Sequence, residues 1–190
     1  MTGAARRALT IDVLVASPRW KDDVGKIKSI VRRAVTRAAA ATLSTTSNEL
    51  AIVLTDDSAI RLLNRDWRGI DAATNVLSFA AKKAGGKHFG AHLGDIVLAY
   101  ETVAREARGE GKPFAHHVAH LAVHGFLHLV GYDHQREADA TTMERTEREI
   151  LRQLAIPDPY RPKTANPTGN PAIYRARHGA KYRRKRAHKR

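Results

Sequence analysis

The sequence contains no cysteine. This absence excludes disulfide bonds and thiolate metal ligands, and it suits a reducing cytoplasm, which is the location we expect. Long apolar runs are also missing. The main apolar stretch, residues 118–130, carries three histidines and is shorter than a membrane span, so we expect no transmembrane helix and no membrane partner. We expect no N-terminal signal peptide either, because Asp12 interrupts the apolar alternation that follows Arg6 and Arg7.

Acidic residues are absent from the C-terminal part of the chain. Residues 163–190 hold ten Lys or Arg side chains and no Asp or Glu, whereas the other 162 residues hold 23 basic and 19 acidic side chains. Much of the net charge of +14 therefore lies in this tail, which includes the run Arg183, Arg184, Lys185 and Arg186. Such a basic arm is attracted to phosphate backbones, so we predict that it binds nucleic acid. The alternative is a solvated extension that aids solubility.

Proline marks the end of the folded domain. Five of the seven prolines fall between Pro157 and Pro171, and proline does not continue a helix. We place the end of the domain near Arg161. The sequence thus predicts one domain, residues 1–161, which is long enough to bury a core, and a disordered basic tail, residues 162–190.

Hydrophobic periodicity predicts the elements of the domain. Strands are expected at residues 9–15, 49–55, 74–79 and 93–99, and helices at residues 24–41, 59–67, 100–108, 113–130 and 137–154. Asp57 or Ser58 is expected to cap the second helix, and residues 81–92 to form a polar loop. The order of elements predicts an α+β domain with a small mixed four-stranded sheet and about five helices.

Three histidines form the most specific pattern. His124, His128 and His134 stand at offsets 0, 4 and 10, with Gly131 at offset 7. Residues four apart share one helix face, and a left-handed glycine can end the helix and let the chain return with the third imidazole. Three nitrogen ligands with an open fourth position are typical of a catalytic zinc site, so we expect one Zn²⁺ ion. Imidazole ligands also suit nickel, copper or iron.

The predicted histidine helix is apolar nearly all round, so it should lie buried at the centre of the domain, where unpartnered imidazoles would be costly. His120, one turn before the first ligand, and Asp133, just before the third, are candidates for supporting the ligands from behind. His120 could also be a fourth ligand or a core residue, and Asp133 could simply hold the turn. His116 and His117 are expected at the surface.

The histidine spacing matches that of metzincin proteases, but the general base does not. Those enzymes place a glutamate directly after the first histidine, where this chain has Gly125. A metal site without that base can still attack a phosphodiester if a cation stabilises the developing charge. Arg68 is a candidate for this cation, because it precedes Gly69 at a predicted bend and its planar fork matches phosphate oxygens. An ordinary surface arginine is the alternative.

With these residues assembled, the chain resembles the YbeY family of rRNA-maturation endoribonucleases. The resemblance rests on residues 119–134 (AHLAVHGFLHLVGYDH), and it is supported by four shorter blocks in the family's order, residues 67–69 (WRG), 74–79 (TNVLSF), 94–97 (GDIV) and 158–160 (DPY). It implies a zinc ion on the three histidines and an arginine, here Arg68, that is important for RNA cleavage. It also implies action on single-stranded RNA, in maturation of the 16S rRNA 3′ end and in ribosome quality control. Residues 163–190 fall outside the family's pattern.

The hypothesis is therefore a zinc-dependent endoribonuclease, a hydrolase of phosphodiester bonds, whose partners are rRNA and the small ribosomal subunit. One rival is a metzincin-like metalloprotease. The other is a non-enzymatic, metal-stabilised protein that binds the ribosome.

Overall fold

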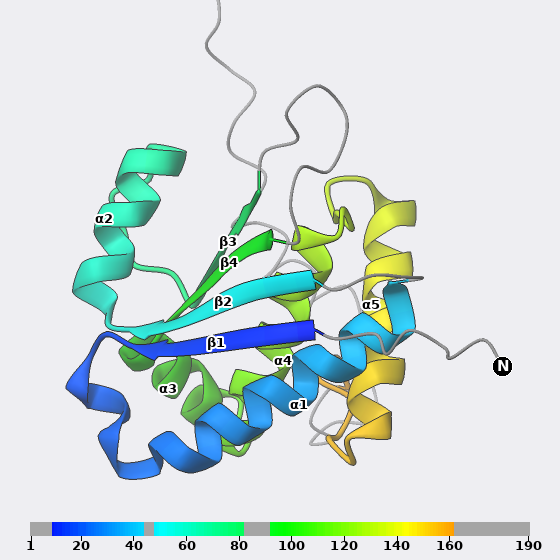
Figure 1. Cartoon of the computed structure of the whole chain (residues 1–190), viewed down its shortest axis with the longest axis horizontal. Helices are drawn as coiled ribbons and strands as arrows, with labels where there is room; N and C mark the ends of the chain where they lie inside the picture. Colours follow the sequence, from blue (N-terminus) through cyan, green and yellow to red (C-terminus); the bar gives the residue numbers. More distant parts are fainter. Residues whose placement is uncertain (1–8, 44–47, 82–91, 162–190) are drawn as a thin grey trace, which may run out of the picture.

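The elements follow the predicted order, with one addition. The computed structural model in Figure 1 describes residues 9–43, 48–81 and 92–161. Its elements are β1 (Leu9–Val15), the 3₁₀ helix η1 (Pro18–Asp23), α1 (Val24–Thr42), β2 (Asn48–Thr55), α2 (Asp57–Arg68), β3 (Val76–Ala80), β4 (His92–Ala99), α3 (Tyr100–Gly109), α4 (Phe114–Leu129) and α5 (Glu137–Gln153). The sequence analysis missed η1. Most of the predicted polar loop, and the whole basic tail, lie outside the described residues.

The sheet is mixed, as predicted. Its strand order is β1-β2-β4-β3. The first three of these strands run parallel to one another, and β3 pairs antiparallel with β4 at the edge. Parallel neighbours need a crossover connection, and α1 supplies it between β1 and β2. The α+β fold class is thereby confirmed.

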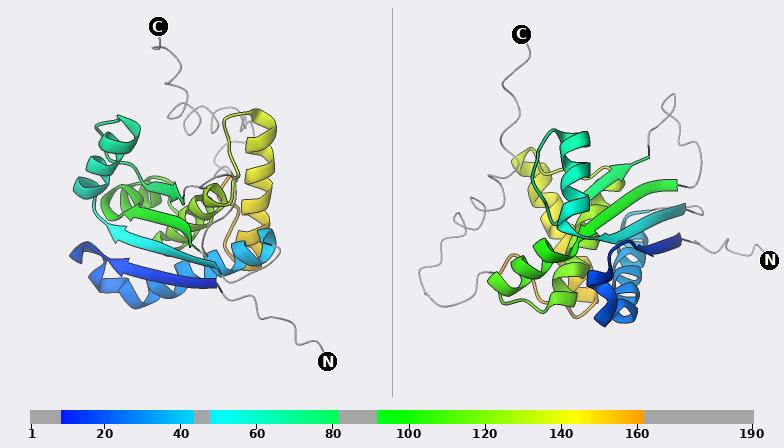
Figure 2. Two further views of the ribbon diagram at one scale, coloured as in Figure 1. Left: turned by 45° about the horizontal axis from the view of Figure 1, so that its top comes forward. Right: turned by 90° about the vertical axis from the view of Figure 1, so that its left-hand side faces the viewer.

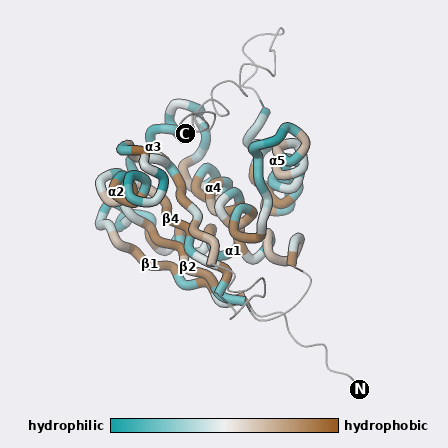
Figure 3. Tube along the Cα trace, turned by 90° about the horizontal axis from the view of Figure 1, so that it is seen from above, coloured by the Kyte–Doolittle hydropathy of each residue, from teal (hydrophilic) through white to brown (hydrophobic). Residues whose placement is uncertain are grey.

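Alternating strand residues divide the core between the two faces of the sheet. Val76, Ile96 and Leu98 face a large apolar cluster that includes buried residues of α1, α4 and α5. Leu77 and Val97 face a smaller cluster around Ile60 of α2. Figure 2 shows α2 set apart from α1, α4 and α5, and Figure 3 shows the strands as the most hydrophobic segments. The histidine helix α4 therefore lies on one face of the sheet and α2 lies on the other.

Gly125 allows α4 to approach the sheet closely. A Cβ at this position would lie 2.9 Å from both the Ile96 Cγ2 and the Ser78 Oγ. Position 125 therefore points into the contact between α4 and strands β3 and β4, and it has no room for a side chain. The glycine that replaces the protease glutamate is a packing requirement of this fold, and a glutamate there would face the sheet.

One predicted helix cap was wrong. Asp56 caps α2, since its carboxylate accepts a hydrogen bond from the Ala59 backbone N–H at 3.0 Å. Asp57 instead accepts hydrogen bonds from the backbone and hydroxyl of Thr102 on α3, at 3.0 and 2.9 Å. Ser58 donates its hydroxyl hydrogen to Asp56. A contact between distant segments thus decides among three neighbouring residues that could each cap a helix.

Candidate metal centre

The three histidines of the sequence pattern come together at the end of α4. His124 and His128 lie one turn apart on this helix, which ends at Leu129. Gly131 then adopts a φ of 96°, and the chain returns with His134. One ring nitrogen from each of the three histidines lies within 4.8 Å of the others. The local geometry that the spacing predicted, a helix stopped by a positive-φ glycine, is therefore present.

Hydrogen bonds on the outer side of two rings aim their inner nitrogens at one point. The Nδ1 of His124 lies 2.8 Å from a Glu147 carboxylate oxygen, and the Nδ1 of His128 lies 3.0 Å from the Tyr132 carbonyl oxygen. Both partners are acceptors, so each Nδ1 carries the proton. When both rings are neutral, as metal ligands must be, the two Nε2 atoms are lone-pair acceptors, and they face each other at 3.2 Å.

Two facing lone pairs repel each other unless a cation lies between them. Tetrahedral zinc with Zn–N bonds of the usual length sets its ligand nitrogens about 3.3 Å apart, close to the separation of the two Nε2 atoms. The residues present therefore fit a metal ion, and the outer hydrogen bonds are of the kind that fixes ring orientation in metal sites.

The acid–base state of the cluster also suits metal binding. Burial, and the charges of His124 and His134, lower the pKa of His128 to about 4. Burial is likewise the main cause of the lowered pKa of His134. Both rings are neutral at physiological pH, so metal binding does not have to displace a proton from either of them.

Glu147 is a central residue that the sequence analysis missed. Its side chain is fully buried on α5, and it accepts hydrogen bonds from His120 Nε2 at 3.2 Å, from His124 Nδ1 and from the Tyr160 hydroxyl. Burial raises the pKa of this carboxyl, but the His124 charge and the imidazole hydrogen bonds outweigh burial and lower it overall. Glu147 is therefore a buried carboxylate that ties three elements together.

His120 and Asp133 lie behind the cluster. His120 is directed to Glu147, which also holds His124, and not to the centre of the three histidines. The Asp133 carboxylate accepts the backbone N–H of His134 at 2.7 Å, so it braces the turn that presents this histidine. The expected surface position of His117 was wrong: this residue is buried and lies 3.1 Å from Glu106 of α3.

Arg68 is not part of the histidine cluster. It is the last residue of α2, and Gly69 follows it in the left-handed conformation with a φ of 65°. The bend expected at this point is present, but α2 packs on the face of the sheet opposite α4, with the edge strand β3 between them. Trp67, which precedes Arg68, is 66% exposed. Its ring meets the Phe79 ring of β3 edge-on, with 5.5 Å between the ring centroids.

Fold and site together define an α+β protein with three histidines that could hold a metal ion at the end of a buried helix. No described helix is long and apolar enough to cross a membrane. The family profile described as "Endoribonuclease YbeY" matches residues 16–155. The chain therefore belongs to the YbeY endoribonuclease family, as its resemblance implied, and the predicted enzyme class is confirmed at the level of the family.

Individual relatives agree with this assignment. "Endoribonuclease YbeY" of Rhodopseudomonas palustris strain BisB18 is 53% identical over 153 residues, covering 78% of this chain and 90% of the relative. The protein of that name from Nitrobacter hamburgensis is 51% identical over 157 residues, covering 80% and 82%. Among solved structures, the solution structure of TM1509 from Thermotoga maritima aligns at 19% identity with a TM-score of 0.47, covering 85% of this chain and 100% of that one, and this likeness is too low to add to the assignment.

Proposed function

We propose that this protein is a zinc-dependent endoribonuclease that cuts single-stranded RNA. We propose that it matures the 3′ end of 16S rRNA and acts in ribosome quality control, with the small ribosomal subunit as partner and the cytoplasm as location. Family membership supports the nuclease activity. The observation that carries the metal dependence is the pair of Nε2 atoms of His124 and His128, which face each other at 3.2 Å as acceptors.

Each group of residues has a distinct task in this proposal. His124, His128 and His134 hold the ion, which supplies Lewis acidity toward water or the scissile phosphate when it is bound. Glu147 keeps the His124 ring in its binding orientation through the Nδ1 hydrogen bond. The Asp133 carboxylate fixes the backbone of His134 in the same way from the turn.

Arg68 and Trp67 are proposed to hold the RNA strand at the edge of the sheet. The arginine binds a phosphate through its planar guanidinium group. The exposed tryptophan offers a flat apolar surface on which an unpaired base can stack, an interaction worth about 1–3 kcal/mol per base. Stacking of this kind requires an unpaired base, so it supports a preference for single strands.

Cleavage by purified protein tests the proposal. The wild-type chain, stripped of metal and reloaded with one equivalent of zinc, should cleave a labelled single-stranded RNA, and the His128→Ala variant should lose both the bound zinc and the cleavage. Arg68→Ala should keep the zinc and lose about 10²–10³-fold in rate, as expected when a cation that stabilises charge in the transition state is removed. Unchanged cleavage by His128→Ala would contradict the proposed zinc dependence. No cleavage by the zinc-loaded wild type would favour the non-enzymatic, metal-stabilised rival.

The proposal includes the predicted division of the chain into a domain, residues 1–161, and a basic tail, residues 162–190. We propose that the tail, with its run from Arg183 to Arg186, raises the affinity for RNA through counterion release. Deletion of residues 163–190 should then weaken RNA binding most at low salt and leave zinc content unchanged. Equal affinity of both chains across a salt titration would show that the tail is only a solvated extension.

A further inference from the structure

The helix α1 carries basic side chains that form no ion pair with a carboxylate of the described residues. It has no acidic residue and five basic ones, Lys26, Lys28, Arg32, Arg33 and Arg37. None of the ion pairs found among the described residues involves α1. By contrast, several arginines of other helices are paired, among them Arg61 of α2 and Arg105 of α3. The positive charge of α1 is therefore available to a partner.

Four of these cations border a groove on the solvent side of the helix, namely Lys28, Arg32, Arg33 and Arg37. The groove has a volume of about 840 Å³, and Gln153 and Leu154 at the end of α5 close one of its sides. At 100° per residue, the small residues Gly25, Ser29, Thr36 and Ala40 fall on one narrow stripe, which forms the floor. An added Cβ at Gly25 would meet nothing within 4 Å, so this end of the floor is open.

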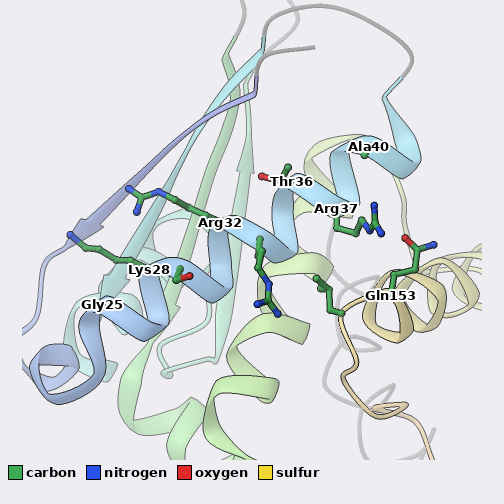
Figure 4. Close-up of a pocket in the computed structure, with 10 residues that line it drawn as sticks. Gly25, Lys28, Arg32, Thr36, Arg37, Ala40 and Gln153 are labelled. Carbon is green, nitrogen blue, oxygen red and sulfur yellow. The ribbon is translucent and has the colours of Figure 1, made fainter. Parts of the chain in front are cut away.

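Basic side chains form both walls of the groove. Lys28 and Arg32 lie on one side of the stripe of small residues, and Arg33 and Arg37 lie on the other. Figure 4 shows Lys28 and Arg32 extending away from α5, and Arg37 extending toward Gln153. The result is a shallow track without bulky side chains on its floor and with positive charge along both sides.

The neighbouring helix does not neutralise the groove. The nearest turn of α5 carries Glu149, but its carboxylate is held by Arg152 at 2.9 Å and by Gln153 at 2.7 Å. The groove is also separate from the metal centre. The opposite side of α1, with Ile27 and Val31, is buried in the core against α4, so the groove opens away from the histidines.

We propose that the α1 groove binds the phosphate backbone of RNA and anchors a part of a long substrate away from the segment that is cut. A phosphate strand complements two rows of cations, and guanidinium groups bind phosphate oxygens in pairs. The identification of the polyanion as RNA rests on the proposed function. The groove itself rests only on the charges and shape of α1.

Binding and cleavage are measured separately to test this. Binding uses the full chain and a labelled 40-nucleotide 2′-O-methyl RNA, whose integrity is checked on a gel. Arg33→Gln/Arg37→Gln should raise Kd about tenfold at 0.1 M salt and reduce the salt slope by about one to two, as expected for two lost phosphate contacts. The matched control, Arg108→Gln/Arg145→Gln, removes two exposed charges from α3 and α5 and should change Kd less than about twofold, because it leaves the proposed contacts in place.

Cleavage of a four-nucleotide RNA, which has too few phosphates to fill the groove and the cleavage site together, should be the same for wild type and the α1 variant. A wild-type chain that cleaves no RNA, combined with the expected loss of binding in the α1 variant, would refute the nuclease activity and keep the groove. Equal loss in both double variants would show a general charge effect and overturn the proposal. Unchanged RNA binding by the α1 variant would also overturn the proposal. This holds even if the variant loses binding to anionic phospholipid vesicles, since the groove would then bind a different polyanion.

Discussion

Glu147 and His124 are joined by a hydrogen bond of 2.8 Å between a fully buried carboxylate on α5 and the outer nitrogen of a ring of the histidine cluster on α4. The bond fixes the position of the ring proton, so the inner nitrogen is free to bind an ion. It also ties the metal centre to α5, because the same carboxylate receives the Tyr160 hydroxyl. Metal affinity and the packing of α5 should therefore respond together to changes at Glu147.

Replacing Glu147 with Gln is the direct test of this coupling. The amide keeps the shape but loses the negative charge and one acceptor, so the rings of His120 and His124 compete for the remaining oxygen. Zinc affinity should fall by about 10–100-fold, the usual effect of losing a residue that orients a ligand. Competition with a chelating dye measures it. Glu149→Gln, on the exposed side of the same helix, is the control and should keep wild-type affinity.

The close approach of α4 to the sheet predicts a large effect from one methyl group. Gly125→Ala places a Cβ 2.9 Å from the Ile96 Cγ2 and the Ser78 Oγ, so the helix or the strands must shift. The free energy of unfolding should fall by about 1–3 kcal/mol, as in other overpacked cores. Urea denaturation measures this change. Gly25→Ala, in open space on α1, should be neutral or slightly stabilising, because alanine favours helices.

Gly125→Glu tests the orientation of α4, which is the structural argument against the protease rival. The side chain of residue 125 would face the strands, so it cannot reach a substrate at the metal centre. We expect destabilised protein without peptidase activity, measured on a fluorogenic peptide library with zinc present. Peptide cleavage by this variant would contradict the orientation of α4 described above.

Residues 158–161, which end the predicted domain, should be needed for stability, and the tail from residue 162 on should not. Lys112 donates to the Pro159 carbonyl at 2.8 Å, Arg148 pairs with Asp158 at 3.4 Å, and Tyr160 donates to Glu147. A chain ending at Arg161 should melt within a few degrees of the full chain. A chain ending at Pro157 loses all three contacts and leaves the buried carboxylate short of one donor, which removes about 1–3 kcal/mol of stability. Thermal denaturation of both chains compares them, and equal melting temperatures would contradict this placement of the boundary.

The histidine cluster could be predicted because its geometry is local. The spacing alone puts His124 and His128 on one face of a helix. Gly131 follows a few residues later, and its positive φ turns the chain back after the helix ends. The strands were equally accessible, since their alternation is visible in the sequence. Glu147 could not be found in this way, because it reaches His124 across 23 residues through the packing of α5 on α4. Its one local signal is that a carboxylate occupies the buried stripe of α5 otherwise formed by Met143, Ile150 and Leu151.

The same limit explains the errors. Asp57 or Ser58 was expected to cap α2, but Asp56 caps it and Asp57 instead contacts Thr102 on another helix. His117 was expected at the surface because it stands near a helix start, but Glu106 of α3 covers it. Asp57 contacts Thr102 and His117 contacts Glu106, and in both pairs the partner lies on another helix. The residues adjacent in sequence to Asp57 and His117 therefore do not reveal these partners.

The metal-free protein should lose stability as the pH falls below neutrality. The pKa of His128 is about 4 in the folded chain, below the ordinary value of 6.5, so between these values the unfolded state binds more protons than the folded state. The stabilisation from keeping this ring neutral is full above pH 6.5 and is lost as the pH falls toward 4. The lowered pKa values of His134 and Glu147 act in the same direction. Urea denaturation of chelator-treated protein at a series of pH values should show this decline, and His128→Gln should make it shallower. His92→Gln, which changes an exposed ring on β4, is the control and should leave the decline in place.

Saturating zinc at pH 7 should raise the free energy of unfolding by about 2.7 kcal/mol at a free concentration one hundred times its Kd. A stability that does not change with pH in the metal-free chain would contradict the neutral, metal-ready state of these rings.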